Sequence, residues 1–167
     1  MTAPTVRRAT PDEWREYRAV RLSALADAPY AFTTTTAEAL TVTEEGWRQR
    51  LRDGACYLAS VDGRDIGLVA AFPEDGGPEL VSMWVHPSAR GSGAGNLLVG
   101  AIIEWAAGEG LPEVGLWVAR DNRHAELLYA RHGFVRTGEV QPMAPDTPDR
   151  LEFRMVHSGA QAGWAMN

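Results

Sequence analysis

The stretch GSGAG at positions 91–95 puts three glycines at alternate positions between a β-rich run and a helical run. The run before it, 79–85, has the short apolar pattern of a strand, and the run after it, 96–107, has the broad apolar face of a buried helix. A second β-rich run, 113–119, follows that helix. This order predicts a right-handed crossover, which places the two strands parallel in one sheet. The pattern therefore indicates an α/β fold.

The N-terminal third is predicted to be mainly helical. A short strand is expected near 5–8, and the capping box in TPDE begins a helix that ends before Pro29. The threonine-rich stretch 31–42 shows no clear period, and a second short helix is expected at 43–53.

The middle of the chain is predicted to be an antiparallel meander. Two β-rich runs, 56–61 and 66–72, are joined by the turn residues DGRD, as in a hairpin. The strand at 79–85 then follows the turn PEDGGP.

The C-terminal part is expected to add a helix at 122–132 and strands near 135–140 and 151–157. The chain is interpreted as a single domain over 1–158, followed by a flexible tail at 159–167.

Composition argues against several classes of function. The chain has 167 residues and one cysteine, Cys56, so it cannot form an internal disulfide. Its four histidines are scattered along the chain without an i, i+4 pair, and no metal site is expected. The first residues lack the apolar core of a signal peptide, and no window approaches the ~18 apolar residues of a membrane span. A cytoplasmic protein with no membrane partner is therefore expected.

Charge bears on the partners. The formal net charge is -6 and the sequence pI is about 5.2, which argues against a broad phosphate-neutralising face, so no nucleic-acid partner is expected. The same balance favours a cationic small molecule or a basic peptide as ligand.

The glycine stretch has the pattern of an anion site. Glycines just before a helix let consecutive backbone N–H groups point at one place, where the helix dipole adds partial positive charge. The alternative is a tight turn without a ligand. The dinucleotide pattern G-x-G-x-x-G fails because Asn96 or Leu98 stands at the required third glycine. The nucleoside-triphosphate pattern fails because no Lys-Ser or Lys-Thr pair follows.

Two motifs follow one another here, with a strand between them. The first is VHPSARGSGAG, with Arg90, Gly93 and Gly95, and the second is NRHAELLYARHGF, with Asn122 and Tyr129. They resemble the two signatures of the GNAT superfamily of acetyl-CoA-dependent N-acetyltransferases. These are Arg/Gln-x-x-Gly-x-Gly/Ala after a strand ending in Val-x-Pro, and Asn-x-x-Ala-x-x-Leu-Tyr-x-x-x-Gly-Phe. The resemblance is clear over about 56–134.

The resemblance implies the GNAT fold, a single mixed central sheet with an antiparallel N-terminal meander, a splayed parallel pair and helices on both faces. It also implies that acetyl-CoA is the co-substrate and that backbone N–H groups of the loop cradle its pyrophosphate. The cofactor-binding residues of the loop are then Arg90, Gly91, Ser92, Gly93, Ala94, Gly95 and Asn96.

The resemblance assigns further roles near the reacting atoms. The main chain of Met83, Trp84 and Val85 would bind the pantetheine, and the Val85 N–H would polarise the acetyl carbonyl. Tyr129 would protonate the departing thiolate. Asn122 would bind the cofactor, cap its helix, or do both.

The general base is less determined by the motifs. Several members of the family use a glutamate five residues before the motif asparagine, and this chain has Trp117 there. Glu79, at the start of its strand, is the leading candidate, because a carboxylate at that place can reach the acceptor amine through water. The alternative is a solvated charge at a strand end.

The expected function is transfer of an acetyl group to a primary amine of a small molecule or peptide by direct attack. Two alternatives stay open: a non-catalytic acyl-CoA sensor, and an acetyltransferase for a protein N-terminus or lysine. The acceptor pocket is expected between the arm at 24–51 and the loop at 141–149. A homodimer is also expected from the resemblance.

Overall fold

The computed structural model describes residues 2–159 and contains one seven-stranded sheet. Its strand order is β1-β2-β3-β4-β5-β7-β6, in which β4 and β5 are parallel and every other neighbouring pair is antiparallel. The strands are β1 (Thr5–Arg8), β2 (Ala55–Val61), β3 (Arg64–Phe72), β4 (Glu79–Val85), β5 (Val114–Ala119), β6 (Val135–Pro142) and β7 (Leu151–His157).

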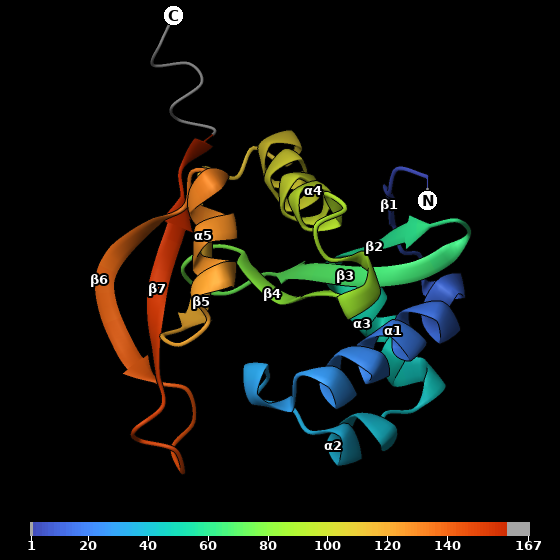
Figure 1. Ribbon diagram of the computed structural model, residues 1–167, viewed down its shortest axis with the longest axis horizontal. Helices are drawn as coiled ribbons and strands as arrows, with labels where there is room; N and C mark the ends of the chain where they lie inside the picture. Colours follow the sequence, from blue (N-terminus) through green and yellow to red (C-terminus); the bar gives the residue numbers. More distant parts are fainter. Residues whose placement is uncertain (1, 160–167) are drawn as a thin grey trace, which may run out of the picture.

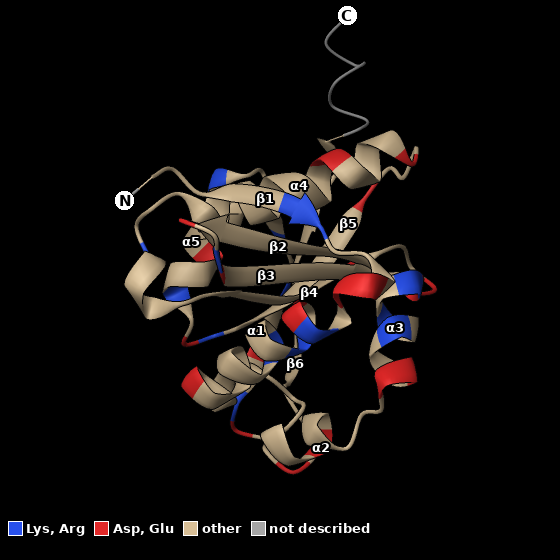
Figure 2. Cartoon of the chain, turned by 90° about the vertical axis from the view of Figure 1, so that its right-hand side faces the viewer, with Lys and Arg blue, Asp and Glu red and all other residues tan. Residues whose placement is uncertain are grey.

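Helices cover both faces of this sheet (Figure 1). One face carries α4 (Ala94–Gly108) and α5 (Arg123–Arg131). The other carries α1 (Trp14–Asp27), α2 (Thr36–Leu40) and α3 (Glu44–Asp53). Figure 2 shows the same layers from the side, with α4 on one side of the meander and α1 on the other. We call the second side the α1–α3 face.

Each face has its own apolar core. Under α4 and α5 the buried side chains include Val69, Leu98 and Leu116, and under α1 and α3 they include Tyr17 and Leu68. Since full burial of one such side chain contributes about 1.5–3 kcal/mol, both layers are held mainly by apolar contact with the sheet. This two-sided burial confirms the predicted fold class.

Most predicted elements are present, with three differences. The stretch around 36–40 forms the short helix α2, which the missing period concealed, although Thr35 and Glu38 form a capping box there. Helix α4 begins at Ala94, inside the glycine stretch, and not at 96. Strand β7 lies between β5 and β6, an order that the sequence did not reveal.

The tail predicted for 159–167 lies, apart from Gly159, outside the described residues. Among the helices of residues 2–159, none is long and apolar enough to cross a membrane.

Candidate functional site: the β4–β5 junction and the glycine loop

Strands β4 and β5 meet at only one point. The single residue pair between them is Glu79 with Gly115, and the Gly115 N–H donates to the Pro78 carbonyl at 3.0 Å. Towards their carboxyl ends the two strands form no further pair within the described chain. The facing backbone edges are therefore available to a ligand, as the predicted splayed parallel pair requires.

A bulge in β4 changes which face its side chains occupy. Leu80 belongs to the core under α4 and Trp84 to the core under α1. The two residues are four positions apart, and in a regular strand an even separation would put both side chains on the same face. The register shifts opposite Val69, and Ser82 has φ 61°, which is rare for a residue with a Cβ. The bulge thus leaves Ser82 as the extra residue in β4.

The main chain at the end of β4 points toward the β5 edge. The His86 N–H donates to the Ile66 carbonyl on β3 at 2.7 Å. Because successive N–H groups of a strand point to opposite edges, the Val85 N–H faces the β5 side. Val85 is therefore oriented as its predicted role with the acetyl carbonyl requires, and Met83 packs against the α4 core.

The glycine loop exposes a row of unpaired donors at the start of α4. Within residues 2–159, no backbone or side-chain acceptor takes the N–H groups of Gly91, Gly93, Gly95 or Asn96. The other N–H groups of the loop have partners: Arg90 donates to the Pro87 carbonyl at 3.4 Å, Ser92 to the Ala89 carbonyl at 3.2 Å, and Ala94 to the Ser92 hydroxyl at 3.3 Å. Unpaired N–H groups at a helix N-terminus form an anion site, so the loop fits a pyrophosphate.

The glycines have different reasons to lack a side chain. Gly91 and Gly93 have φ of 82° and 96°, the left-handed region that favours glycine, and a Cβ at either would meet no heavy atom within 4 Å. At Gly95 a Cβ would lie 3.3 Å from a Leu128 methyl and 3.5 Å from the Met83 methyl. Gly95 therefore lets α4 approach α5 and β4.

The Arg90 side chain lies away from the loop donors. Its Nη2 donates to the Asp27 carboxylate at 2.9 Å, and its Nε donates to the Val85 carbonyl at 3.1 Å. The Trp84 indole N–H donates to the same Asp27 oxygen at 2.9 Å. These bonds hold the pKa of Asp27 below its usual value, with the Trp84 bond as the largest cause. Arg90 thus ties the loop to the end of α1.

Tyr129 lies on α5, buried to 6% exposure, with its ring centroid 5.8 Å from that of Phe134. Burial raises the pKa of its hydroxyl well above the usual value, so the hydroxyl stays protonated at neutral pH. The hydroxyl forms no hydrogen bond with any residue of 2–159, so it is free to donate one to a ligand.

Two asparagines of the motifs have structural partners. The Asn122 side chain caps α5 by accepting from the Ala125 N–H at 3.2 Å, which is the capping role predicted for it. The Asn96 amide oxygen lies 3.0 Å from Nε2 of His132. Asn96 therefore links the start of α4 to the end of α5.

Glu79 forms an ion pair with Arg154 of β7 at the point where β4 meets β5. Their side chains are 17% and 16% exposed, and the second Glu79 oxygen, Oε2, is buried without a partner among the described residues. The alternative for Glu79, a solvated charge at a strand end, does not fit this position, since the carboxylate is largely enclosed. Trp117 lies beside this pair, with its ring 5.5 Å from the Arg154 guanidinium carbon.

The arm expected to form one side of the acceptor pocket contacts the residue that follows the expected loop. Arg150, just after the loop at 141–149, donates to the Tyr30 carbonyl on the arm at 2.6 Å. The sequence reasoning missed three residues on the α1–α3 face, Arg21, Arg50 and Ser82. Both arginines donate to the Ser82 hydroxyl. No local pattern marks these residues, because three separate elements bring them together.

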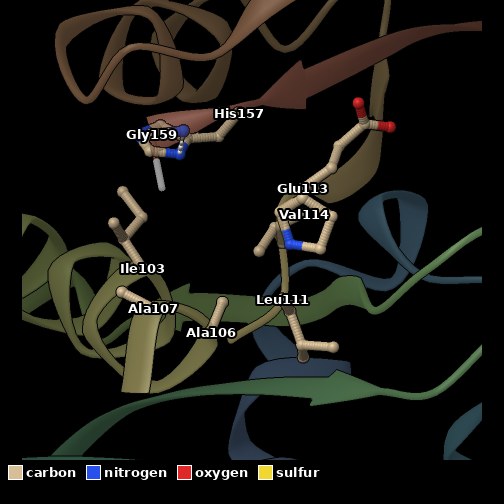
Figure 3. Close-up of a pocket in the computed structure, with 9 residues that line it drawn as sticks. Ile103, Ala106, Ala107, Leu111, Glu113, Val114, His157 and Gly159 are labelled. Carbon is tan, nitrogen blue, oxygen red and sulfur yellow. Dashed lines mark hydrogen bonds between the residues drawn. The ribbon is translucent and has the colours of Figure 1, made fainter. Parts of the chain in front are cut away.

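A cavity of about 240 Å³ lies elsewhere, at the far end of α4 from the glycine loop (Figure 3). Its walls are mainly apolar side chains, including Ile103 and Leu111, with His157 at one side. It contacts none of the predicted site residues, so it is not the acceptor pocket. Within residues 2–159, no group of three or more His, Cys, Asp or Glu side chains is placed to hold a metal ion.

Comparison with known proteins agrees with this geometry. The family model described as "Acetyltransferase (GNAT) family" matches residues 12–134. The L-2,4-diaminobutyric acid acetyltransferase of Nocardia farcinica is 29% identical over 80 residues, which are 46% of this chain and 42% of that protein. The match covers only 21% to 42% of the length of that protein and two other curated relatives, so the chain spans less than half of each.

Solved structures share the fold. A GNAT-family acetyltransferase from Streptococcus pneumoniae has a TM-score of 0.75 at 23% identity, over 92% of this chain and 97% of that one. The PaiA N-acetyltransferase from Thermoplasma acidophilum, solved in complex with coenzyme A, has a TM-score of 0.69 at 16% identity, over 94% and 99%. Since the family model covers well over half of the chain, the protein belongs to the GNAT acetyltransferase family.

Proposed function

We propose that this protein transfers the acetyl group of acetyl-CoA to a primary amine by direct attack. The observation that carries the proposal is the row of unpaired N–H groups at Gly91, Gly93, Gly95 and Asn96, beside the edge where β4 and β5 diverge. Membership of a family that uses acetyl-CoA supports it. The Nocardia relative named for an amino-acid acceptor is in accord with an amine substrate.

In this proposal the chain's residues bind three parts of acetyl-CoA: the pyrophosphate, the pantetheine and the acetyl group. The loop N–H groups bind the pyrophosphate, and Met83, Trp84 and Val85 bind the pantetheine through their main chain. The Val85 N–H stabilises negative charge on the carbonyl oxygen as the amine nitrogen bonds to the acetyl carbon and the carbon–sulfur bond breaks. The amine loses one proton and the leaving sulfur gains one.

Tyr129 is proposed to donate a hydrogen bond to the leaving sulfur. Complete transfer of its proton is unfavourable, because a thiol of pKa ~8.5 is a stronger acid than a phenol of pKa ~10. Burial raises the Tyr129 pKa further and makes the transfer more unfavourable. Tyr129 therefore stabilises the thiolate while a proton reaches it from the amine or water.

Glu79 is proposed as the proton acceptor for the amine, acting through water. Its unpartnered Oε2 is the observation in favour. The ion pair with Arg154 holds the carboxylate in one orientation, since both side chains are largely enclosed.

The first test is release of free thiol from acetyl-CoA with a panel of amines, for the wild type and Tyr129→Phe. We expect turnover with one class of amine and a decrease in kcat of about 10²- to 10³-fold in the variant, as for loss of one hydrogen-bond donor to a developing anion. Tyr57→Phe, the same change on the remote strand β2, is the matched control and should keep full activity. Equal activity of Tyr129→Phe and wild type would contradict the role of Tyr129.

Calorimetry separates the alternatives. Binding of acetyl-CoA without turnover of any amine would favour the sensor, and turnover only with a protein N-terminus or lysine would favour a protein acetyltransferase. Absence of acetyl-CoA binding by the folded protein would contradict the proposal. A homodimer and a cytoplasmic location remain predictions, to be tested by light scattering and by cell fractionation.

Gly93→Val tests whether the N–H groups of the glycine loop bind acetyl-CoA. The substitution strains a position at φ 96° and puts a side chain at the unpaired N–H groups, so we expect much weaker acetyl-CoA binding by calorimetry in a folded protein. Gly110→Val is the control, because Gly110 has φ 71° and open space but lies after the other end of α4. Equal loss of affinity in both variants, or none in Gly93→Val, would contradict the assignment.

A further inference from the structure

Two arginines from different helices converge on one serine of β4. Arg21 of α1 donates through Nη1 to the Ser82 hydroxyl at 2.8 Å, and Arg50 of α3 donates through Nη2 to the same oxygen at 3.3 Å. Ser82 is the bulge residue with φ 61°. It directly precedes Met83, so the two arginine side chains reach the strand that carries the proposed transfer site.

These two arginines have no acidic partner in the described chain. Other arginines of the protein do: Arg7 pairs with Glu13 and Asp65, and Arg48 pairs with Glu44 and Asp12. Within residues 2–159, no carboxylate lies within 4.0 Å of the Arg21 or Arg50 guanidinium. Aromatic rings lie there instead, Phe32 at 5.0 Å from the Arg21 carbon and Phe72 at 4.6 Å from the Arg50 carbon.

Such an arrangement is costly without an anion. Arg21 is 6% exposed, and burial and the Arg50 charge lower its pKa to about 10. Nε of Arg50 and the hydroxyl of Tyr17 are buried without hydrogen-bond partners among residues 2–159. Buried charges in proteins are normally paired, and buried donors are normally bonded.

The cluster offers more hydrogen-bond donors than acceptors, because the Ser82 hydroxyl oxygen is the atom that accepts from both arginines. A serine hydroxyl has two lone pairs and one proton, so a Ser82 oxygen that accepts from both arginines keeps its O–H free to donate. Each guanidinium has five N–H donors and uses one of them here. Arg50 and Ser82 are only half-buried, so a ligand can reach them from solvent. The missing partner is therefore a small oxyanion.

We propose that the acceptor is an amine that also carries a carboxylate, held by Arg21, Arg50 and the Ser82 hydroxyl on the α1–α3 face. This inference rests on the proposed acetyl transfer and specifies its substrate class. A carboxylate fits because its planar pair of oxygens matches the guanidinium fork. The acceptor site thus has the opposite charge to the whole chain, whose net charge is -6 and which favoured a cationic ligand.

The test compares matched acceptors in the thiol-release assay: L-amino acids and ω-amino acids, their carboxamides, their decarboxylated amines and the corresponding phosphonates. We expect kcat/KM to be about 10- to 150-fold higher for a carboxylate than for its amide or decarboxylated form, as for loss of one charge-assisted hydrogen bond. Higher kcat/KM for uncharged amines, polyamines or phosphonates would overturn the carboxylate assignment.

Variants show whether the two arginines bind the carboxylate or only stabilise the bulge at Ser82. Arg50→Met should raise KM for the carboxylate acceptor about 10- to 150-fold while KM for acetyl-CoA and the slow rate with the decarboxylated amine stay unchanged. Arg50→Lys, which keeps the charge, should recover part of the affinity. Arg48→Met, on the same helix and paired outside this cluster, is the matched control. An equal loss with all acceptors, together with a lower Tm, would show that the arginines only brace β4.

A binding measurement keeps this inference separate from the proposed chemistry. Titration of the protein with coenzyme A and then with glycine or β-alanine, followed by NMR, should shift signals of residues around Ser82 in the wild type and not in Arg50→Met. Carboxylate binding without turnover would leave the site intact and contradict the acetyl transfer. Acetyl transfer with no preference and no carboxylate binding would overturn the site alone.

Discussion

At the scale of single residues, Gly115 decides whether the Glu79–Arg154 pair can form. A Cβ at Gly115 would collide with the Arg154 guanidinium and lie 2.5 Å from Oε2 of Glu79. Both side chains are largely enclosed, so neither can move aside without leaving the ion pair. The bare backbone at position 115 therefore makes the one contact point of β4 and β5 possible.

Gly115→Ala should lower the free energy of unfolding by about 1–3 kcal/mol, because the added methyl overpacks a filled site. Chemical denaturation measures the effect. Gly100→Ala is the control: Gly100 lies inside α4 with no heavy atom of another segment within 4 Å, and alanine there should stabilise by about 0.5–1 kcal/mol. A neutral Gly115→Ala would mean that the pair shifts freely.

Glu79→Gln keeps an acceptor for Arg154 and removes the proposed base. We expect kcat to decrease by about 10²- to 10⁴-fold and the acid limb of the pH–rate profile to disappear. Glu113→Gln, an exposed change near the start of β5, is the control. An unchanged profile in Glu79→Gln would show that another group accepts the proton.

At the scale of elements, α5 is joined to its surroundings by two histidines. His132, just after α5, lies 3.0 Å from the Asn96 side chain, and His157 on β7 packs its ring 5.3 Å from that of Phe134. Burial lowers the pKa of both histidines below the ordinary value, with a further lowering of His132 by Arg131. The folded protein therefore holds both rings neutral.

A histidine whose pKa is lower in the folded than in the unfolded protein stabilises the fold at a pH above its unfolded pKa of about 6.5. This stability is lost as the pH falls through the pKa of the folded protein. We therefore expect the free energy of unfolding to decrease between pH 7.5 and pH 5. His157→Gln should make this decrease smaller. His124→Gln, an exposed change on α5, should leave it as in the wild type. Identical pH dependence in His157→Gln and wild type would contradict this account.

At the scale of the whole molecule, one apolar core joins the two parts of the sheet. The strands β1–β4 and β5–β7 share a single residue pair, but Val69 of β3, Leu98 of α4, Leu116 of β5 and Met155 of β7 lie in one cluster. Helix α4 packs on β1–β4 and reaches α5 (Figure 1). The shared apolar core therefore holds the parts together alongside the contact between β4 and β5.

The protein should accordingly unfold in one cooperative transition, with coincident loss of near-UV circular dichroism and of tryptophan fluorescence. Saturating acetyl-CoA, at about 100 times its Kd, should raise the free energy of unfolding by about 2.7 kcal/mol. Two separate transitions would show that β5–β7 forms an independent unit.

The sequence by itself determined the elements and the cofactor loop. The hairpin turn, the meander, the crossover and the caps depend on local periodicity and on residues such as Asn122 and the loop glycines, whose conformational requirements act within a few positions. The two motifs then predicted the family and the fold, both of which are confirmed. Even α2 had a local signal in its capping box at Thr35.

Only the tertiary structure decided the order of the last strands, the environment of Glu79 and the convergence of Arg21, Arg50 and Ser82. Arg21 and Ser82 are 61 positions apart, and Arg150 and Tyr30 are 120 apart. Contacts of that separation are set by how helices pack on the sheet and by the bulge that redirects one strand, and no local pattern records them. The motifs proposed to bind the acetyl donor therefore lie in short local stretches of the sequence, whereas the proposed acceptor site forms only when the chain folds.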